Sequence, residues 1–116
     1  MNQIINDLTT KKCVACEGGV PPLTPDEVEV YQKKFAEPWE VVAHMRLKKI
    51  FKFPDFKKAL DFVDKVGFLA EEEGHHPDVY LSYGQAVIEL TTHAIKGLSE
   101  NDFILAAKID GLGVSD

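Results

Sequence analysis

The stretch DVYLSYGQAVIELTT, residues 78–92, decides the fold because it reads as two β-strands around a single turn. Val and Leu occur on both sides of Gly84-Gln85, with Tyr before the pair and Ile after it, and β-branched and aromatic residues favour strands. A glycine-containing pair between two such runs is typical of a tight hairpin turn. The stretch therefore predicts an antiparallel β-hairpin with Gly84 and Gln85 at its turn.

This turn placement fixes a register for the two strands. Tyr83 then pairs with Ala86, and counting outward sets His76 opposite His93. Directly opposed residues have Cβ atoms about 5 Å apart, so the two imidazoles would face each other at the open end of the hairpin. His75 would lie on the adjoining backbone. A slip of the turn by one residue would change these partners.

The segments on either side of the hairpin predict the remaining elements. Thr24-Pro25-Asp26-Glu27 combines a helix cap, a proline suited to the first helical position and a capping box, and predicts a helix to about residue 35. Residues 39–44 and 47–53 alternate as strands, and Asp55 can cap a long helix ending near Gly74. Ser99 can cap a last helix. The order α-β-β-α-β-β-α predicts an α+β single domain, with a four-stranded antiparallel sheet and helices on one face.

Length and composition narrow the class of protein. The chain has 116 residues, 45% of them hydrophobic, which suits one domain with a real core. Its formal charge of -6 disfavours nucleic-acid binding, which needs clustered Lys and Arg. No apolar run reaches the roughly 20 residues of a membrane helix, and no signal peptide opens the sequence. We therefore expect a cytoplasmic protein that binds neither nucleic acid nor membranes.

Residues 1–23 are expected to form an N-terminal arm, and residues 24–116 the folded domain. The arm carries a lone CxxC motif, Cys13 to Cys16, followed by a turn-rich run from Glu17 to Pro22. Two thiolates cannot by themselves complete a tetrahedral zinc site. Two alternatives stay open: a pair of reduced cysteines, or a labile metal or dithiol site.

The clustered histidines are the clearest candidate for chemistry. Imidazoles titrate near neutral pH, so His75, His76 and His93 could donate and accept protons under physiological conditions. A metal site that adds Glu71 or Asp102 is one alternative, but neighbouring residues in an extended chain point to opposite faces, which hinders adjacent histidines from sharing one ion. Polar residues at a hairpin base, without a catalytic role, are another. Both alternatives stay open at this point.

Asp102 lies three residues after Ser99, which suits a helix-capping role. A carboxylate in the first turn could also orient an imidazole. The sequence leaves open whether Asp102 only caps the helix or also orients an imidazole.

The spacing Glu71-x3-His75-His76-Pro77-x5-Tyr83-x9-His93-x8-Asp102 resembles the signature of the pterin-4a-carbinolamine dehydratases. The similarity extends over roughly residues 24–110, and includes Trp39 and the run from Thr91 to His93. This resemblance implies a lyase that dehydrates 4a-hydroxytetrahydrobiopterin to quinonoid dihydrobiopterin, in recycling of the tetrahydrobiopterin cofactor.

The resemblance also implies roles for individual residues. His75, His76 and His93 would be the acid/base groups, and the reaction would need neither a metal nor a redox cofactor. Four further residues would contact the pterin substrate: Glu71, Pro77, Thr92 and Asp102. The family resemblance implies a homodimer or homotetramer, and some members bind a protein partner in a secondary regulatory role.

Overall fold

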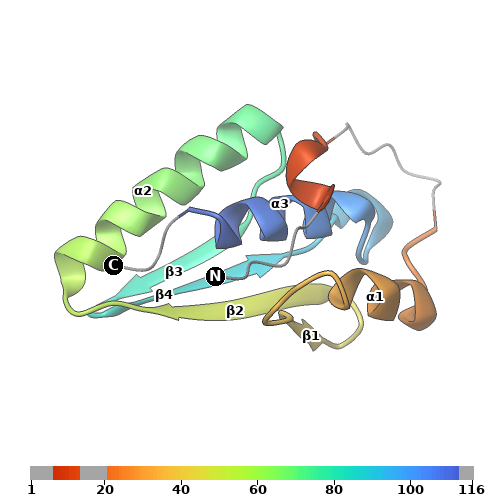
Figure 1. The fold of residues 1–116 in the computed structure, drawn as a ribbon, viewed down its shortest axis with the longest axis horizontal. Helices are drawn as coiled ribbons and strands as arrows, with labels where there is room; N and C mark the ends of the chain where they lie inside the picture. Colours follow the sequence, from red (N-terminus) through yellow and green to blue (C-terminus); the bar gives the residue numbers. More distant parts are fainter. Residues whose placement is uncertain (1–6, 14–20, 113–116) are drawn as a thin grey trace.

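The computed structural model describes residues 7–13 and 21–112. Its four-stranded antiparallel sheet has the order β1-β2-β4-β3, formed by β1 (Glu40–Val42), β2 (Arg46–Lys52), β3 (Asp78–Ser82) and β4 (Gln85–Leu90). Helices α2 (Phe56–Glu73) and α3 (Glu100–Asp110) cover one face, while α1 (Pro25–Gln32) lies beside the end of the sheet (Figure 1). The predicted α+β class and element order are confirmed. Two short 3₁₀ helices, η1 (Asp7–Thr10) and η2 (His93–Ile95), were not expected.

Helix α2 begins and ends where the sequence predicts. The side chain of Asp55 accepts a hydrogen bond from the backbone N–H of Lys58, and Gly74 ends the helix in the left-handed conformation with φ 68°. One side of the helix is buried against the rest of the domain. Phe56 is exposed, and the buried residues recur at three- and four-residue steps: Ala59, Phe62, Val66 and Ala70.

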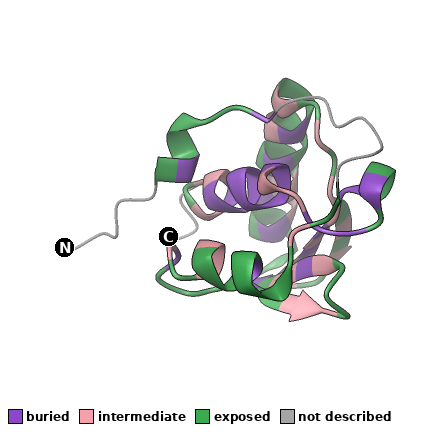
Figure 2. Cartoon of the chain, turned by 90° about the vertical axis from the view of Figure 1, so that its right-hand side faces the viewer, coloured by how far each residue is buried: buried purple, intermediate pink, exposed green. Residues whose placement is uncertain are grey.

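Helix α3 is the centre of the core. Every residue from Asn101 to Ala107 is buried, so the helix appears almost entirely in the buried colour (Figure 2). It lies among α2, the sheet and η1, whose Leu8 is fully buried. A carboxylate in such a helix must find hydrogen-bond partners, because an unpaired buried charge is costly. Asp102, fully buried in the first turn, is therefore of particular interest.

The register predicted for the hairpin is wrong. The turn consists of Tyr83 and Gly84, so Ser82 pairs with Gln85 and Val79 with Ile88. Gly84 adopts φ 72°, a conformation that glycine takes without strain, and this favours its place in the turn. Each partner moves by two residues, which keeps the buried face but removes the predicted opposition of two histidines.

The hairpin between β1 and β2 also differs from the expected one. His44 was expected within a strand, but it lies in the turn with φ 57°, and Ala43 before it has φ 53°. Met45 N–H donates to the carbonyl of Val42 and closes this turn. Two successive residues with positive φ form a turn that matches the twist of the flanking strands, and because Val42 pairs with Arg46 the loop has three residues, Ala43 to Met45.

Candidate active site

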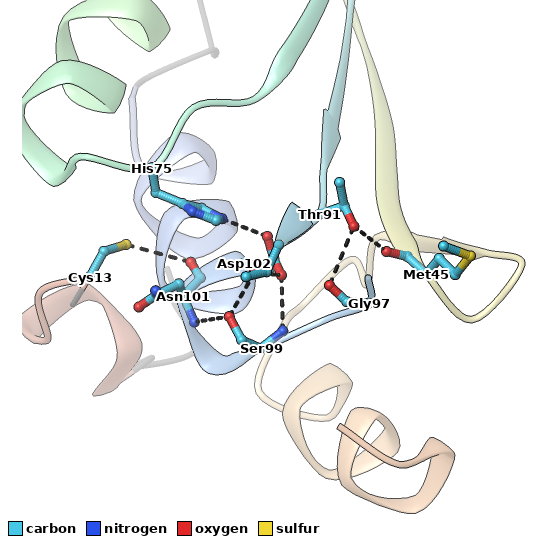
Figure 3. A network of polar contacts seen from close by, with 9 residues as sticks. Cys13, Met45, His75, Thr91, Gly97, Ser99, Asn101 and Asp102 are labelled. Atoms are coloured by element: carbon cyan, nitrogen blue, oxygen red, sulfur yellow. Dashed lines mark hydrogen bonds and ion pairs between the residues drawn. The ribbon is translucent and has the colours of Figure 1, made fainter. Parts of the chain in front are cut away.

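Asp102 joins the end of α2, the loop after β4 and the start of α3. Its Oδ1 lies 2.6 Å from Nε2 of His75. Its Oδ2 accepts hydrogen bonds from Oγ1 of Thr92 at 2.7 Å and from the backbone N–H of Ser99 at 2.9 Å. The close-up shows His75 and Ser99 reaching this carboxylate from different segments (Figure 3). Asp102 therefore caps its helix and also orients an imidazole, so both roles considered from the sequence are present.

The hydroxyl groups around Asp102 have defined hydrogen-bond directions. The backbone N–H of Asn101 donates to Oγ of Ser99, which lies 2.8 Å from Oγ1 of Thr92. Because the Thr92 hydroxyl donates its only proton to Asp102, the Ser99 hydroxyl must donate to Oγ1 of Thr92. The carboxylate thus receives donors on Oδ2, and its remaining oxygen, Oδ1, faces His75.

This arrangement determines the tautomer of a neutral His75. A carboxylate accepts hydrogen bonds, so Nε2 of His75 must carry the proton that it donates to Asp102. The lone pair of a neutral imidazole is then on Nδ1. Because the side chain of His75 is 12% exposed and that of Asp102 is fully buried, the pair is mostly shielded from water. His75 is therefore equipped to accept a proton at Nδ1.

His76 has a separate partner. Its Nε2 lies 2.7 Å from Oε2 of Glu71, in the last turn of α2. Both side chains are exposed, at 60% and 77%, so the pair can orient the imidazole but adds little to stability. Pro77 follows and is half-buried.

The loop from Thr91 to Leu98 holds Thr92 and His93 beside this network. The Thr91 hydroxyl donates to the carbonyl of Met45, and Thr92 pairs with Gly97 across the loop. A Cβ on Gly97 would lie 2.6 Å from Cβ of Pro22, so the packing of the residue 21–23 segment requires glycine there. His93, at the start of η2, is exposed.

The predicted site residues thus form two directly bonded groups. The first is His75, Thr92 and Asp102, and the second is Glu71 with His76. His93 is linked to the first group through its neighbour Thr92. Sequence reasoning missed Ser99 as a member of the network, although its capping-box spacing was the available signal. Across residues 7–13 and 21–112, no three His, Cys, Asp or Glu side chains are grouped as ligands for a metal ion.

Cys13 lies on the other side of Asn101, with Sγ 3.6 Å from that residue's carbonyl oxygen. Burial, with added repulsion from the Glu73 carboxylate, raises the pKa of the Cys13 thiol to about 12. A thiol with such a pKa stays protonated and is a poor nucleophile at neutral pH. Cys16, the other half of the CxxC motif, lies outside the described residues.

No helix in the described part of the chain has the length and apolar character needed to cross a membrane. Two cavities are lined by none of His75, His76 and His93. One, of about 350 Å³, is lined on α2 by residues that include Phe68 and Glu72. The other, of about 410 Å³, lies between α1 and the β1–β2 turn. We therefore place the candidate active site by its polar geometry.

Comparisons with known proteins identify the family of this chain. The family described as pterin 4 alpha carbinolamine dehydratase matches residues 21–112. A protein of Alkaliphilus metalliredigens is 49% identical over 91% of this chain and 96% of its own length, and one of Rickettsia canadensis is 50% identical over 89% and 94%. Both are named as pterin-4-alpha-carbinolamine dehydratases.

Two solved structures share the fold. The transcriptional coactivator/pterin dehydratase from Brucella melitensis superposes with a TM-score of 0.71 at 28% identity, covering 78% of this chain and 96% of that one. A pterin dehydratase-like protein identified as a RuBisCO assembly factor in the alpha-carboxysome gives a TM-score of 0.59 at 25% identity, with 70% and 95% covered. The resemblance inferred from the residues is thus confirmed, and the chain belongs to the pterin-4a-carbinolamine dehydratase family.

Proposed function

We propose that this chain dehydrates 4a-hydroxytetrahydrobiopterin to quinonoid dihydrobiopterin in recycling of tetrahydrobiopterin. The reaction breaks the bond between C4a and its hydroxyl oxygen, and that oxygen leaves as water after receiving a proton. The N5 proton is removed, and its electron pair forms the C4a=N5 double bond. Proton transfers alone balance the reaction, so no oxidant or reductant is consumed.

The observation that carries this proposal is the bonded group of His75, Asp102 and Thr92. Asp102 sets the tautomer of neutral His75 and leaves Nδ1 able to accept a proton. We assign His75 as the base that takes the N5 proton. His76 and His93, both exposed, are the candidates for the acid that protonates the leaving oxygen. Positioned acid/base groups typically contribute about 10²–10⁴-fold each.

Four other residues are proposed to contact the substrate or hold the acid/base groups in place. Glu71 orients His76, and Asp102 and Thr92 orient His75. Pro77 is proposed to line the pocket beside the paired histidines. No metal or redox cofactor enters this mechanism, and a cytoplasmic location stays a prediction from the sequence.

Single substitutions of the three histidines test the assignment. We expect His75→Ala, His76→Ala and His93→Ala each to lower kcat for the carbinolamine in a protein that still folds. Comparing the acid limbs and base limbs of their pH–rate profiles would show which proton transfer each variant has lost. Three folded variants with wild-type turnover would remove histidine catalysis from the proposal.

Self-association through α2 is proposed as well. Phe68 is 71% exposed on this helix and, with Leu69 and Leu112, lines the 350 Å³ cavity. A large aromatic side chain exposed beside an apolar hollow is typical of an interaction surface. We propose the same surface as the site for a protein partner, since the two similar solved proteins are a transcriptional coactivator/pterin dehydratase and a RuBisCO assembly factor.

A further inference from the structure

Glu73, the last residue of α2, holds a carboxylate that is 7% exposed. Nζ of Lys108 donates to its Oε2 at 2.6 Å, and the backbone N–H of Cys13 donates to its Oε1 at 2.9 Å. Burial alone would raise the pKa of Glu73, but these two donors outweigh it and hold the pKa below its ordinary value. Both oxygens of a mostly buried carboxylate are therefore committed to specific partners.

This ion pair joins the two elements that carry the acid/base network. Glu73 is separated from His75 only by Gly74, whose left-handed conformation turns the chain out of α2. Lys108 lies on α3, the helix that carries Asp102 in its first turn. The contact of 2.6 Å between His75 and Asp102 depends on how closely these two elements are held. The Glu73–Lys108 pair bridges the same two elements.

The N-terminal segment adds a third attachment at the same place. Besides the N–H of Cys13, Nζ of Lys12 donates to the carbonyl of Glu72 at 2.9 Å. Sγ of Cys13 approaches the carbonyl of Asn101 on α3. Figure 3 shows Cys13 reaching Asn101 while His75 reaches the adjacent Asp102. Residues 12 and 13 therefore contact both sides of the junction.

We propose that Glu73 is a positioning residue: bound to Lys108 and to the Cys13 N–H, it fixes the end of α2 against α3 so that His75 meets Asp102. This inference rests on the proposed function, because it assigns the network to catalysis. It gives the N-terminal segment a role through its backbone, without any reaction of the thiol. The Glu73–Lys108 ion pair lies where α2, α3 and residues 12–13 meet, and it sets the position of His75 relative to Asp102.

The first test is steady-state kinetics of Glu73→Gln and Lys108→Met with the carbinolamine. Small displacements of a catalytic group are costly, so we expect kcat to fall roughly ten- to a hundredfold while KM changes about twofold or less. Lys108→Arg, which retains a donor and the charge, should recover most of kcat. Asp61→Asn is the matched control, since it removes another lysine–carboxylate pair of α2, the exposed pair with Lys57. We expect it to turn over like the wild type.

The second test reads the geometry without relying on activity. In protein labelled with ¹⁵N-histidine, the Nε2–H of His75 donates to a carboxylate and should give a distinct imidazole resonance. We expect Glu73→Gln to shift or broaden this resonance and Asp61→Asn to leave it unchanged. A wild type without dehydratase activity but with this response would refute the proposed function and keep the positioning role.

Wild-type kcat together with an unchanged His75 resonance in folded Glu73→Gln would overturn the positioning role. If that variant does not fold, Glu73→Asp supplies the test, because it keeps the charge but withdraws the carboxylate by one methylene. We expect a smaller loss of kcat and a displaced His75 resonance. No change in either measurement would again refute the proposal. Cys13→Ala keeps the N–H and should retain kcat; a large loss in folded protein would show that the thiol matters instead.

Discussion

Replacing Asp102 with asparagine tests the hydrogen-bond directions of the network. The amide oxygen must remain on the side of Ser99, because the backbone N–H there needs an acceptor. The amide NH₂ would then face Nε2 of His75, so two donors would meet at a site that now spans 2.6 Å. His75 can relieve this conflict only by moving its proton to Nδ1 or by turning away. Either response removes the proposed base.

The size of the effect follows from this tautomer argument. Losing a positioned base costs about 10²–10⁴ in kcat, and the comparable Asp→Asn change in a Ser-His-Asp triad lies near the top of this range at about 10⁴. The stability cost should be modest, since asparagine still caps the helix. We expect Asp102→Asn to lose about 1–2 kcal/mol of unfolding free energy, as weaker hydrogen bonds replace charge-assisted ones. That loss corresponds to a Tm lower by about 4–8 °C.

Turnover and thermal melting should be measured on the same preparation of Asp102→Asn. Asp110→Asn is the control: this carboxylate lies on the same helix and accepts hydrogen bonds from Lys49 and Trp39, and it is outside the histidine network. It should lose stability but keep kcat. If folded Asp102→Asn retained kcat within about threefold, well inside the range expected for a lost base, the argument for His75 would be wrong.

Three further results are expected. His93→Ala should lower kcat for dehydration by roughly two to four orders of magnitude, with little loss of Tm because the residue is exposed. The control is His44→Asn, which should change neither kcat nor Tm because asparagine suits the positive φ of the turn. Phe68→Ser should reduce the mass measured by light scattering toward the 12.9 kDa of the monomer. A wild-type protein that is already monomeric at micromolar concentration would contradict self-association through α2. The lowered pKa of Glu73 stabilises the fold above the ordinary carboxyl pKa, and this contribution is lost as pH falls through the folded-state value. The Tm difference between wild type and Glu73→Gln should therefore narrow as the solution is acidified below pH 4.5, and a constant difference would argue against a lowered pKa.

The element order could be predicted because its signals are local. Asp55 and Gly74 bound α2 through their own backbone preferences, and the Ser99 capping box marks the start of α3. The hairpin register was not decided by such signals. Gly84 can occupy either position of a two-residue turn, and both placements leave the same side chains facing the helices.

The candidate site also combines features that local sequence signals predict with features that only the fold determines. The capping-box spacing pointed to Asp102 near Ser99, but only the fold could bring His75 within hydrogen-bond distance of it. Three acidic residues at the C-terminal end of a helix are unfavourable for its dipole when the helix is considered alone. In the structure, Glu73 is paired with Lys108, which lies 35 residues further along the chain. A contact over that separation leaves no periodic pattern in the sequence.

The most direct test of the proposed function is turnover of freshly generated 4a-hydroxytetrahydrobiopterin by the purified protein. The carbinolamine can also lose water without catalysis, so the rate of quinonoid dihydrobiopterin formation must be compared with that background. We predict a rate that rises in proportion to protein concentration and that falls to near background with His75→Ala. A rate equal to the background at micromolar wild-type protein would contradict the assignment of this chain as a dehydratase.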